Sequence, residues 1–137
     1  MAAHLVKNYG AAIQAAEIAD PAMATLLMEH GGALIAFAQL RSGPAPPCVV
    51  TRQPIEIWRF YLDKAFIGRG IAAVLMDRSL AEVAARGADV CWLGVWERNL
   101  RAQAFYRKYG FTVVGTQFYD VGIDRQTDYV MARPVAR

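Results

Sequence analysis

Two glycines one residue apart, Gly68 and Gly70, stand between a strand-like segment and a helix-like one. Residues 55–62 are rich in β-branched and aromatic side chains that partly alternate, which predicts a strand. Residues 71–85 predict a helix that ends at Gly87. Its apolar side chains fall on one stripe: Ala72, Met76, Leu80 and Val83. A strand that enters a helix through a glycine turn indicates an α/β layer.

The rest of the second half continues this order of elements. Residues 90–96 predict a strand, and residues 99–109 predict a helix closed by Gly110. Further strands are expected at 111–114, extending toward residue 118, and at 127–133. The order strand–helix–strand–helix–strand predicts a mixed sheet with a locally parallel pair of strands.

The first half carries weaker signals. Residues 2–18 are rich in alanine and predict a helix that ends at residues 20–21, Asp-Pro. Residues 23–28 and 33–40 predict a hairpin. Residues 42–54 contain four prolines and predict a loop.

Composition sets the broad class of protein. The 137 residues, 55% hydrophobic and 20% charged, suit one domain spanning residues 1–137. The net charge of +3 is scattered, which argues against a nucleic-acid partner. No apolar stretch reaches ~18 residues and no signal peptide is recognised, so no membrane association is expected. Cys48 and Cys91 form no disulfide or metal framework, so a cytoplasmic protein without a metal is predicted.

A glycine turn before a helix can bind an anion. The first helical N–H groups lack partners within the helix, and glycine lets a phosphate approach the backbone. A tight turn without a ligand is the alternative. A P-loop is excluded because Gly-Lys-Ser/Thr is absent. A dinucleotide fingerprint could use Ala73 and Glu97, but too little chain follows to build two nucleotide-binding halves.

The helix at residues 99–109 carries a second pattern. Asn99 is a natural N-cap. One face is apolar: Ala102, Phe105, Tyr106 and Tyr109. Tyr106 lies two turns from Asn99 along the same edge, so an amide and a phenol are aligned there. The alternative is an ordinary cap above core aromatics.

Together these motifs resemble the GNAT superfamily of acyl-CoA N-acyltransferases. The signature Q/R-x-x-G-x-G/A is matched by Ile67, Gly68, Arg69, Gly70, Ile71 and Ala72. Ile67 replaces the usual Gln or Arg, so the turn relies on backbone donors. The motif N-x-x-A-x-x-F-Y-x-x-x-G-F is complete at Asn99, Ala102, Phe105, Tyr106, Gly110 and Phe111. The close resemblance covers residues 55–111, and a looser one covers 23–135.

The resemblance implies a GNAT-like α/β fold, a twisted mixed sheet flanked by helices. Only about 20 residues precede Met23, so the family's first strand and helix are expected to be shortened or missing. The implied reaction is direct transfer of an acetyl group from acetyl-CoA to a primary amine of a small molecule. The resemblance also allows a homodimer. The alternatives are a non-catalytic acyl-CoA-binding or dimerisation domain, and an acyltransferase acting on a protein N-terminus or another macromolecule.

The resemblance also implies roles for individual residues. The backbone from Ile67 to Ala72 would hold the pyrophosphate of CoA. Backbone groups at Tyr61 and Leu62 would pair with the pantetheine and stabilise the oxyanion. Asn99 would hydrogen-bond the pantetheine, beside Ala102 and Phe105.

Two side chains are expected to move protons. Tyr106 would protonate the thiolate, a transfer close to balance if the phenol keeps its ordinary pKa of ~10 against ~8.5 for a thiol. Glu56 would deprotonate the amine directly or through water; the alternative is a surface carboxylate paired with Arg59. The acceptor is expected to meet the loops at 42–54 and 119–126.

Overall fold

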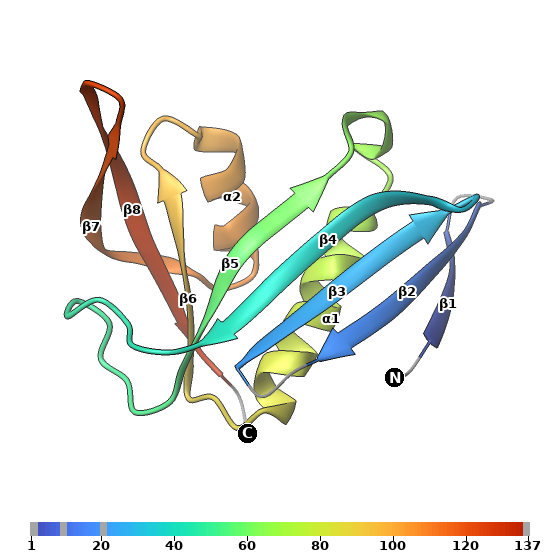
Figure 1. Ribbon diagram of the computed structural model, residues 1–137, viewed down its shortest axis with the longest axis horizontal. Coiled ribbons are helices and arrows are strands. Elements are labelled where there is room, and N and C mark those ends of the chain that lie inside the picture. Colours follow the sequence, from blue (N-terminus) through green and yellow to red (C-terminus); the bar gives the residue numbers. More distant parts are fainter. Residues whose placement is uncertain (1–2, 9–10, 20–21, 136–137) are drawn as a thin grey trace.

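The computed structural model describes residues 3–8, 11–19 and 22–135, with only the backbone of the first two segments. The described elements form an eight-stranded sheet and two α-helices (Figure 1). In chain order they are β1 (Ala3–Asn8), β2 (Ala11–Ala19), β3 (Met23–His30), β4 (Ala33–Ser42), β5 (Pro54–Leu62), α1 (Ile71–Ala85), β6 (Val90–Trp96), α2 (Leu100–Lys108), β7 (Thr112–Val121) and β8 (Asp124–Pro134). No helix in the described part of the chain is long and apolar enough to cross a membrane.

The first five strands form an antiparallel meander. The helix predicted for residues 2–18 is wrong, because β1 and β2 form a hairpin there and β2 pairs with β3. Pairing with a neighbouring strand has overridden the helical preference of alanine. The predicted end of that helix, at residues 20–21, lies outside the described residues. Within the described residues no helix precedes β3, so this segment contributes strands alone.

The second half follows the predicted order. Helix α1 connects β5 to β6, which pair in parallel, and the sheet ends in the order β6-β8-β7. The bounds of α1 and β6 agree with the prediction, and α2 begins directly after Asn99. The mixed sheet with a local parallel pair is therefore confirmed. The predicted loop at 119–126 is instead the tip of the β7–β8 hairpin.

Both helices contribute to one apolar core on the same face of the sheet. The buried side chains of α1 are Ile71, Leu75, Met76, Ser79 and Val83. The buried face of α1 is therefore rotated slightly from the predicted apolar stripe, since Ala72 and Leu80 are only partly buried. Ser79 is tolerated in the core because its hydroxyl donates to the carbonyl of Leu75 at 2.8 Å.

The loop at residues 43–53 covers part of the opposite face. Val49 packs there against Trp92 of β6 and two residues of β8, in a second and smaller cluster. Cys48 lies so close to Gly115 that a Cβ at Gly115 would meet its Sγ at 2.6 Å. Glycine at 115 therefore lets the loop approach the sheet. Cys91, in contrast, is fully buried, and burial raises the pKa of its thiol to about 12.

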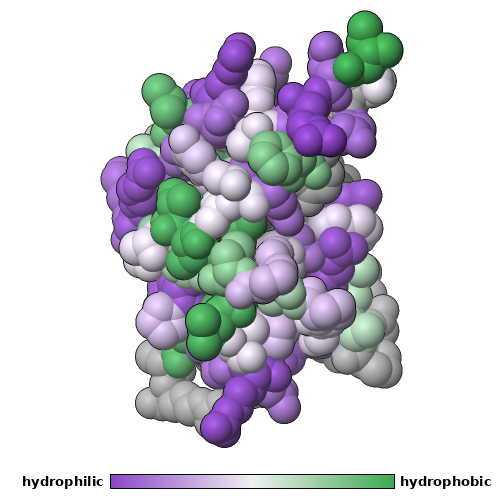
Figure 2. Space-filling view, turned by 90° about the vertical axis from the view of Figure 1, so that its left-hand side faces the viewer, coloured by the Kyte–Doolittle hydropathy of each residue, from purple (hydrophilic) through white to green (hydrophobic). Residues whose placement is uncertain are grey.

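The outer strand β7 exposes several apolar side chains. Val113 and Val114 are each 40% exposed, and Phe118 is 60% exposed. On this side of the molecule, apolar residues lie as separate spots among polar ones (Figure 2). The spots form no continuous surface of the kind that a stable interface buries.

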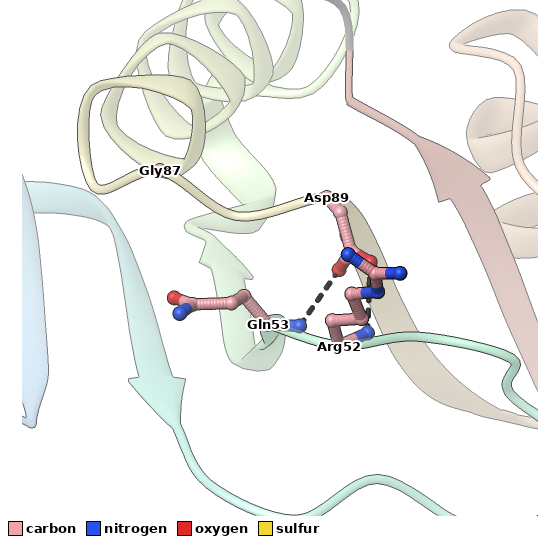
Figure 3. Close-up of a pocket in the computed structure, with 4 residues that line it drawn as sticks. All are labelled: Arg52, Gln53, Gly87 and Asp89. Carbon is pink, nitrogen blue, oxygen red and sulfur yellow. Dashed lines mark hydrogen bonds between the residues drawn. The ribbon is translucent and has the colours of Figure 1, made fainter.

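Asp89 anchors the loop at residues 43–53 to the start of β6 (Figure 3). Its carboxylate accepts hydrogen bonds from the hydroxyl of Thr51 and from the backbone N–H groups of Arg52, at 2.8 Å, and Gln53, at 3.0 Å. The hydroxyl of Thr51, followed by the N–H of Arg52, lowers the pKa of Asp89 to about 2. The loop is thus held by a carboxylate that remains charged at all ordinary pH values.

We predict that Asp89 makes stability depend on pH. Its pKa is lower in the folded chain than in the unfolded one, where it is ~3.9, so its contribution is complete above pH ~4 and is lost as the pH falls toward ~2. Asp89→Asn should lower the free energy of unfolding by about 1 kcal/mol at pH 7. It should also reduce the loss of stability between pH ~4 and pH ~2.

Urea unfolding between pH 2 and pH 7 measures both effects. The matched control is Asp124→Asn in the exposed β7–β8 turn, which should behave like the wild type. If Asp89→Asn loses as much stability between pH ~4 and pH ~2 as the wild type does, Asp89 is not the source of the pH dependence.

Candidate functional site

A wedge opens between the parallel strands β5 and β6. They pair only at Pro54–Val90, Ile55–Cys91 and Glu56–Trp92, although β5 continues to Leu62 and β6 to Trp96. Beyond that point the two strands diverge (Figure 1). The edges of β5 and β6 that face each other therefore have no strand partner there, and an extended chain could hydrogen-bond to them.

A β-bulge lies where the strands part. In the β4–β5 register Gln39 faces Arg59 and Leu40 faces Ile57, so Trp58 is the extra residue. A bulge bends its strand and increases the local twist. It thus accounts for β5 leaving the direction of β6 directly after Glu56.

The glycine turn lies at the far end of β5, beyond the open part of the wedge. Gly68 has φ +85°, and Gly70 has φ +77° and is the N-cap of α1. In the described part of the chain, no heavy atom outside the two adjoining residues lies within 4 Å of a Cβ placed on Gly68. The first turn of α1 contains no acidic residue. Open space, unpaired helical N–H groups and the positive end of the helix dipole fit the phosphates of a nucleotide.

The side chains around this turn include apolar residues and one charged residue, Arg69. Ile67 is extended and 41% exposed, while Ile71 is buried in the core. The guanidinium of Arg69 lies over the ring of Phe66 at 5.2 Å. Ile67 offers no side-chain donor at the usual Gln or Arg position, so the donors expected there would come from the backbone.

Aromatic side chains of α2 pack against the part of β5 that borders the wedge. Phe60 lies on the part of β5 that does not pair with β6. Its ring centroid is 5.8 Å from that of Phe105 and 6.3 Å from that of Tyr106. Tyr106 also contacts Phe111, at 6.0 Å. Burial among these rings raises the pKa of Tyr106 to about 12, so its phenol keeps its proton at neutral pH.

The N-terminus of α2 is capped as predicted. The Oδ1 of Asn99 accepts the backbone N–H of Ala102 at 3.1 Å. Asn99 is exposed, and the capping bond leaves its Nδ2 able to donate to a ligand. The cap and a ligand contact are therefore compatible in one residue.

Gln103 holds α2 to the end of β6. Its side chain is 2% exposed, and its Nε2 donates to the carbonyls of Trp96, at 3.1 Å, and Glu97, at 2.9 Å. Gln103 was not among the predicted site residues, because a glutamine between two alanines resembles a surface residue. The signal was its position, four residues after the capping Asn99.

Glu56 lies on the sheet face opposite the helices. Its neighbours Ile55 and Ile57 belong to the core cluster, and side chains alternate along a strand. Its Oε1 accepts a hydrogen bond from the Nε of Arg41 at 2.7 Å, so its partner is Arg41 and not Arg59, the possible partner named in the alternative interpretation. Arg59 instead bonds Gln39, at 3.3 Å. The reason is the register, which places Arg41 directly opposite Glu56.

Glu56 opens onto a pocket of about 580 Å³. The pocket is lined by Arg41, Ser42, Gly43, Pro44, Ala45, Pro46, Glu56, Trp92 and Gln117. The proline-rich loop expected to meet the acceptor thus forms one wall. Glu56 and Tyr106 occupy opposite faces of the sheet, and the wedge lies beside both. No group of three or more His, Cys, Asp or Glu side chains suited to a metal occurs in the described part of the chain.

Sequence comparisons match residues 3–111 to the Acetyltransferase (GNAT) family. An uncharacterized N-acetyltransferase of Mycobacterium tuberculosis is 37% identical over 126 residues, which cover 92% of this chain and 76% of the relative.

Solved structures agree in fold. Nourseothricin acetyltransferase aligns with a TM-score of 0.72 and 21% identity, over 91% of this chain and 72% of its own. The PaiA N-acetyltransferase of Thermoplasma acidophilum, solved with coenzyme A, aligns with a TM-score of 0.61 and 22% identity, over 82% and 61%. At these identities the likeness shows the fold alone.

We predict that Gln103 fixes the position of α2. Gln103→Leu should lower the free energy of unfolding by about 1–3 kcal/mol, because two carbonyls lose a buried donor. Amide hydrogen exchange should accelerate in α2 more than in α1, which separates a local loosening from a general loss of stability. Gln39→Leu, whose hydrogen bond to Arg59 is exposed, is the control and should cost less than about 0.5 kcal/mol. Equal effects of the two substitutions would contradict this role.

Proposed function

Because the chain belongs to the GNAT family and is an acyl-CoA-dependent N-acetyltransferase, we propose that it transfers an acetyl group from acetyl-CoA to a primary amine of a small molecule. The proposal takes residues 1–137 as one domain with one site. The observation that carries it is the wedge between β5 and β6, with Tyr106 on one face of the sheet and Glu56 on the other. A thioester in the wedge would have a proton donor on one side and a proton acceptor on the other.

The proposed CoA site uses the backbone. The N–H groups from Gly68 to Ala72 would bind the pyrophosphate, since both glycines have positive φ and Gly68 faces open space. The free edge of β5, at Tyr61 and Leu62, would pair with the pantetheine, and an N–H there would stabilise the oxyanion. The Nδ2 of Asn99 would donate to the pantetheine. The complex of the PaiA relative with coenzyme A supports this choice of ligand.

Tyr106 would assist departure of the thiolate. The amine nitrogen forms its bond to the carbonyl carbon, the C–S bond breaks, and the phenol supplies a proton to sulfur. With the pKa of Tyr106 at about 12, full transfer to a thiolate of ordinary pKa ~8.5 would be uphill by roughly 5 kcal/mol. In the free protein, proton transfer from Tyr106 to the thiolate is therefore not close to thermoneutral, as it would be for a phenol of ordinary pKa. A thiolate released among the same apolar rings would also have a raised pKa, which narrows the difference.

Glu56 would accept the proton that the amine loses. Its side chain is 11% exposed and opens onto the acceptor pocket. The hydrogen bond from Arg41 occupies Oε1, so Oε2 is the oxygen available to the amine or to an intervening water. This arrangement supports a role at the site in preference to a plain surface carboxylate.

The first test is release of free thiol from acetyl-CoA with a panel of amines. Tyr106→Phe should lower kcat at least ~10-fold and leave CoA affinity nearly unchanged, because the ring and its packing remain. Tyr109→Phe, at the C-cap of α2 and beside Phe105, is the matched control and should keep wild-type kcat. Equal kcat in Tyr106→Phe and wild type would remove the acid role. CoA binding without thiol release for any amine would indicate a non-catalytic binding domain.

The second test is the pH dependence of the rate. Glu56→Gln should lower kcat/KM about 10²-fold at pH 7, with partial recovery at higher pH as the amine deprotonates in solution. The wild type should show a shallower rise, because Glu56 accepts the proton. A pH–rate profile with the same shape and height in Glu56→Gln would reject the base role.

A further inference from the structure

The ion pair between Arg41 and Glu56 leaves hydrogen-bonding capacity on both partners. It consists of one bond, from Nε to Oε1 at 2.7 Å. A guanidinium has five N–H donors and a carboxylate has two acceptor oxygens. Among the described residues, neither the Nη1 and Nη2 groups of Arg41 nor the Oε2 of Glu56 have a hydrogen-bond partner. No buried side-chain nitrogen or oxygen is left unsatisfied in the described part, so Oε2 is reached by solvent.

The two charged groups are held in place. The cross-strand register sets Arg41 opposite Glu56. The guanidinium of Arg41 lies on the ring of Trp58 at 4.1 Å, and that of Arg59 lies over the same ring at 4.1 Å. A guanidinium stacked on an indole keeps a defined plane, so its terminal N–H groups present a fixed fork.

The pocket beyond this pair has no excess charge. Among the described residues that line it, Arg41 and Glu56 alone are ionisable, and the loop wall contributes serine, glycine, proline and alanine. A simple cationic amine would compete with Arg41 for Glu56 and leave the guanidinium facing it. A ligand with an ammonium beside a carboxylate would satisfy both groups and preserve neutrality. Trp92 gives an apolar wall for a side chain.

We propose that the acceptor is a small zwitterionic amine of the α-amino acid type. Its ammonium binds the Oε2 of Glu56, and its carboxylate binds the Nη1 and Nη2 fork of Arg41. A protein N-terminus lacks the carboxylate next to its amine and leaves the fork unpaired. This inference rests on the proposed function, since the amine held by Glu56 is the one that is acetylated.

The experiment compares α-amino acids with their amides and their decarboxylated amines. The readouts are kcat/KM from thiol release and, independently of turnover, the shift in unfolding temperature caused by each compound. The wild type should prefer the amino acid over the matched amide and amine by at least ~10-fold, because each analogue loses a charged hydrogen-bonded contact. Arg41→Gln should bring this ratio close to one.

Arg59→Gln is the matched control, because it removes the same charge from the same ring of Trp58, and Arg59 bonds Gln39 rather than Glu56. It should keep the preference of the wild type. Acetylation of amides, amines or peptides at rates equal to amino acids would support the proposed function and overturn this inference. A preference that survives Arg41→Gln would also overturn it. Stabilisation by amino acids without turnover would contradict the proposed function, and loss of that stabilisation in Arg41→Gln would then support only the zwitterion-binding part of the inference.

Discussion

The parallel pairing of β5 and β6 ends after Glu56 and Trp92, and the rest of the site depends on this early end. Backbone N–H and C=O groups in the middle of a sheet are normally satisfied by the next strand. Here the bulge at Trp58 turns β5 away, and the facing edges of both strands are left open. A sheet that remained paired to Leu62 and Trp96 would have no place for an extended ligand.

The elements around the wedge supply features that the open strand edges do not carry: a phenol, a carboxylate and a turn suited to an anion. Helix α1 begins at Gly70 with uncapped N–H groups and no acidic residue in its first turn, which favours an anion. Helix α2 brings the partly buried phenol of Tyr106 to the core face, and Gln103 holds this helix to the end of β6. On the other face, the Asp89-anchored loop and Arg41 enclose the pocket around Glu56.

The sequence predicted the part of the fold where local signals and tertiary contacts agree. The glycines, the Asn99 cap and the apolar stripe of α2 gave bounds close to those of α1, β6 and α2, because each acts within its own element. The last two strands are longer than predicted, because they extend each other by pairing through the segment predicted as a loop. The segment at residues 2–18 was predicted wrongly, because pairing with β3 decided its structure and alanine carries no strand signal. Arg59, considered as a possible partner of Glu56, is not its partner, since a cross-strand pair depends on register, and a bulge shifts register in a way that the sequence does not show. The roles of Tyr106, Glu56 and the turn remain predictions.

The central claim is that the wedge and its glycine turn bind coenzyme A. The most direct measurement is thermal unfolding with CoA and, separately, with pantetheine, which lacks the pyrophosphate. CoA at 100 times its Kd should add about 2.7 kcal/mol of stability, and pantetheine at the same concentration should add clearly less, because it cannot use the turn at Gly68 and Gly70. No stabilisation by CoA, or equal stabilisation by both compounds, would contradict the account.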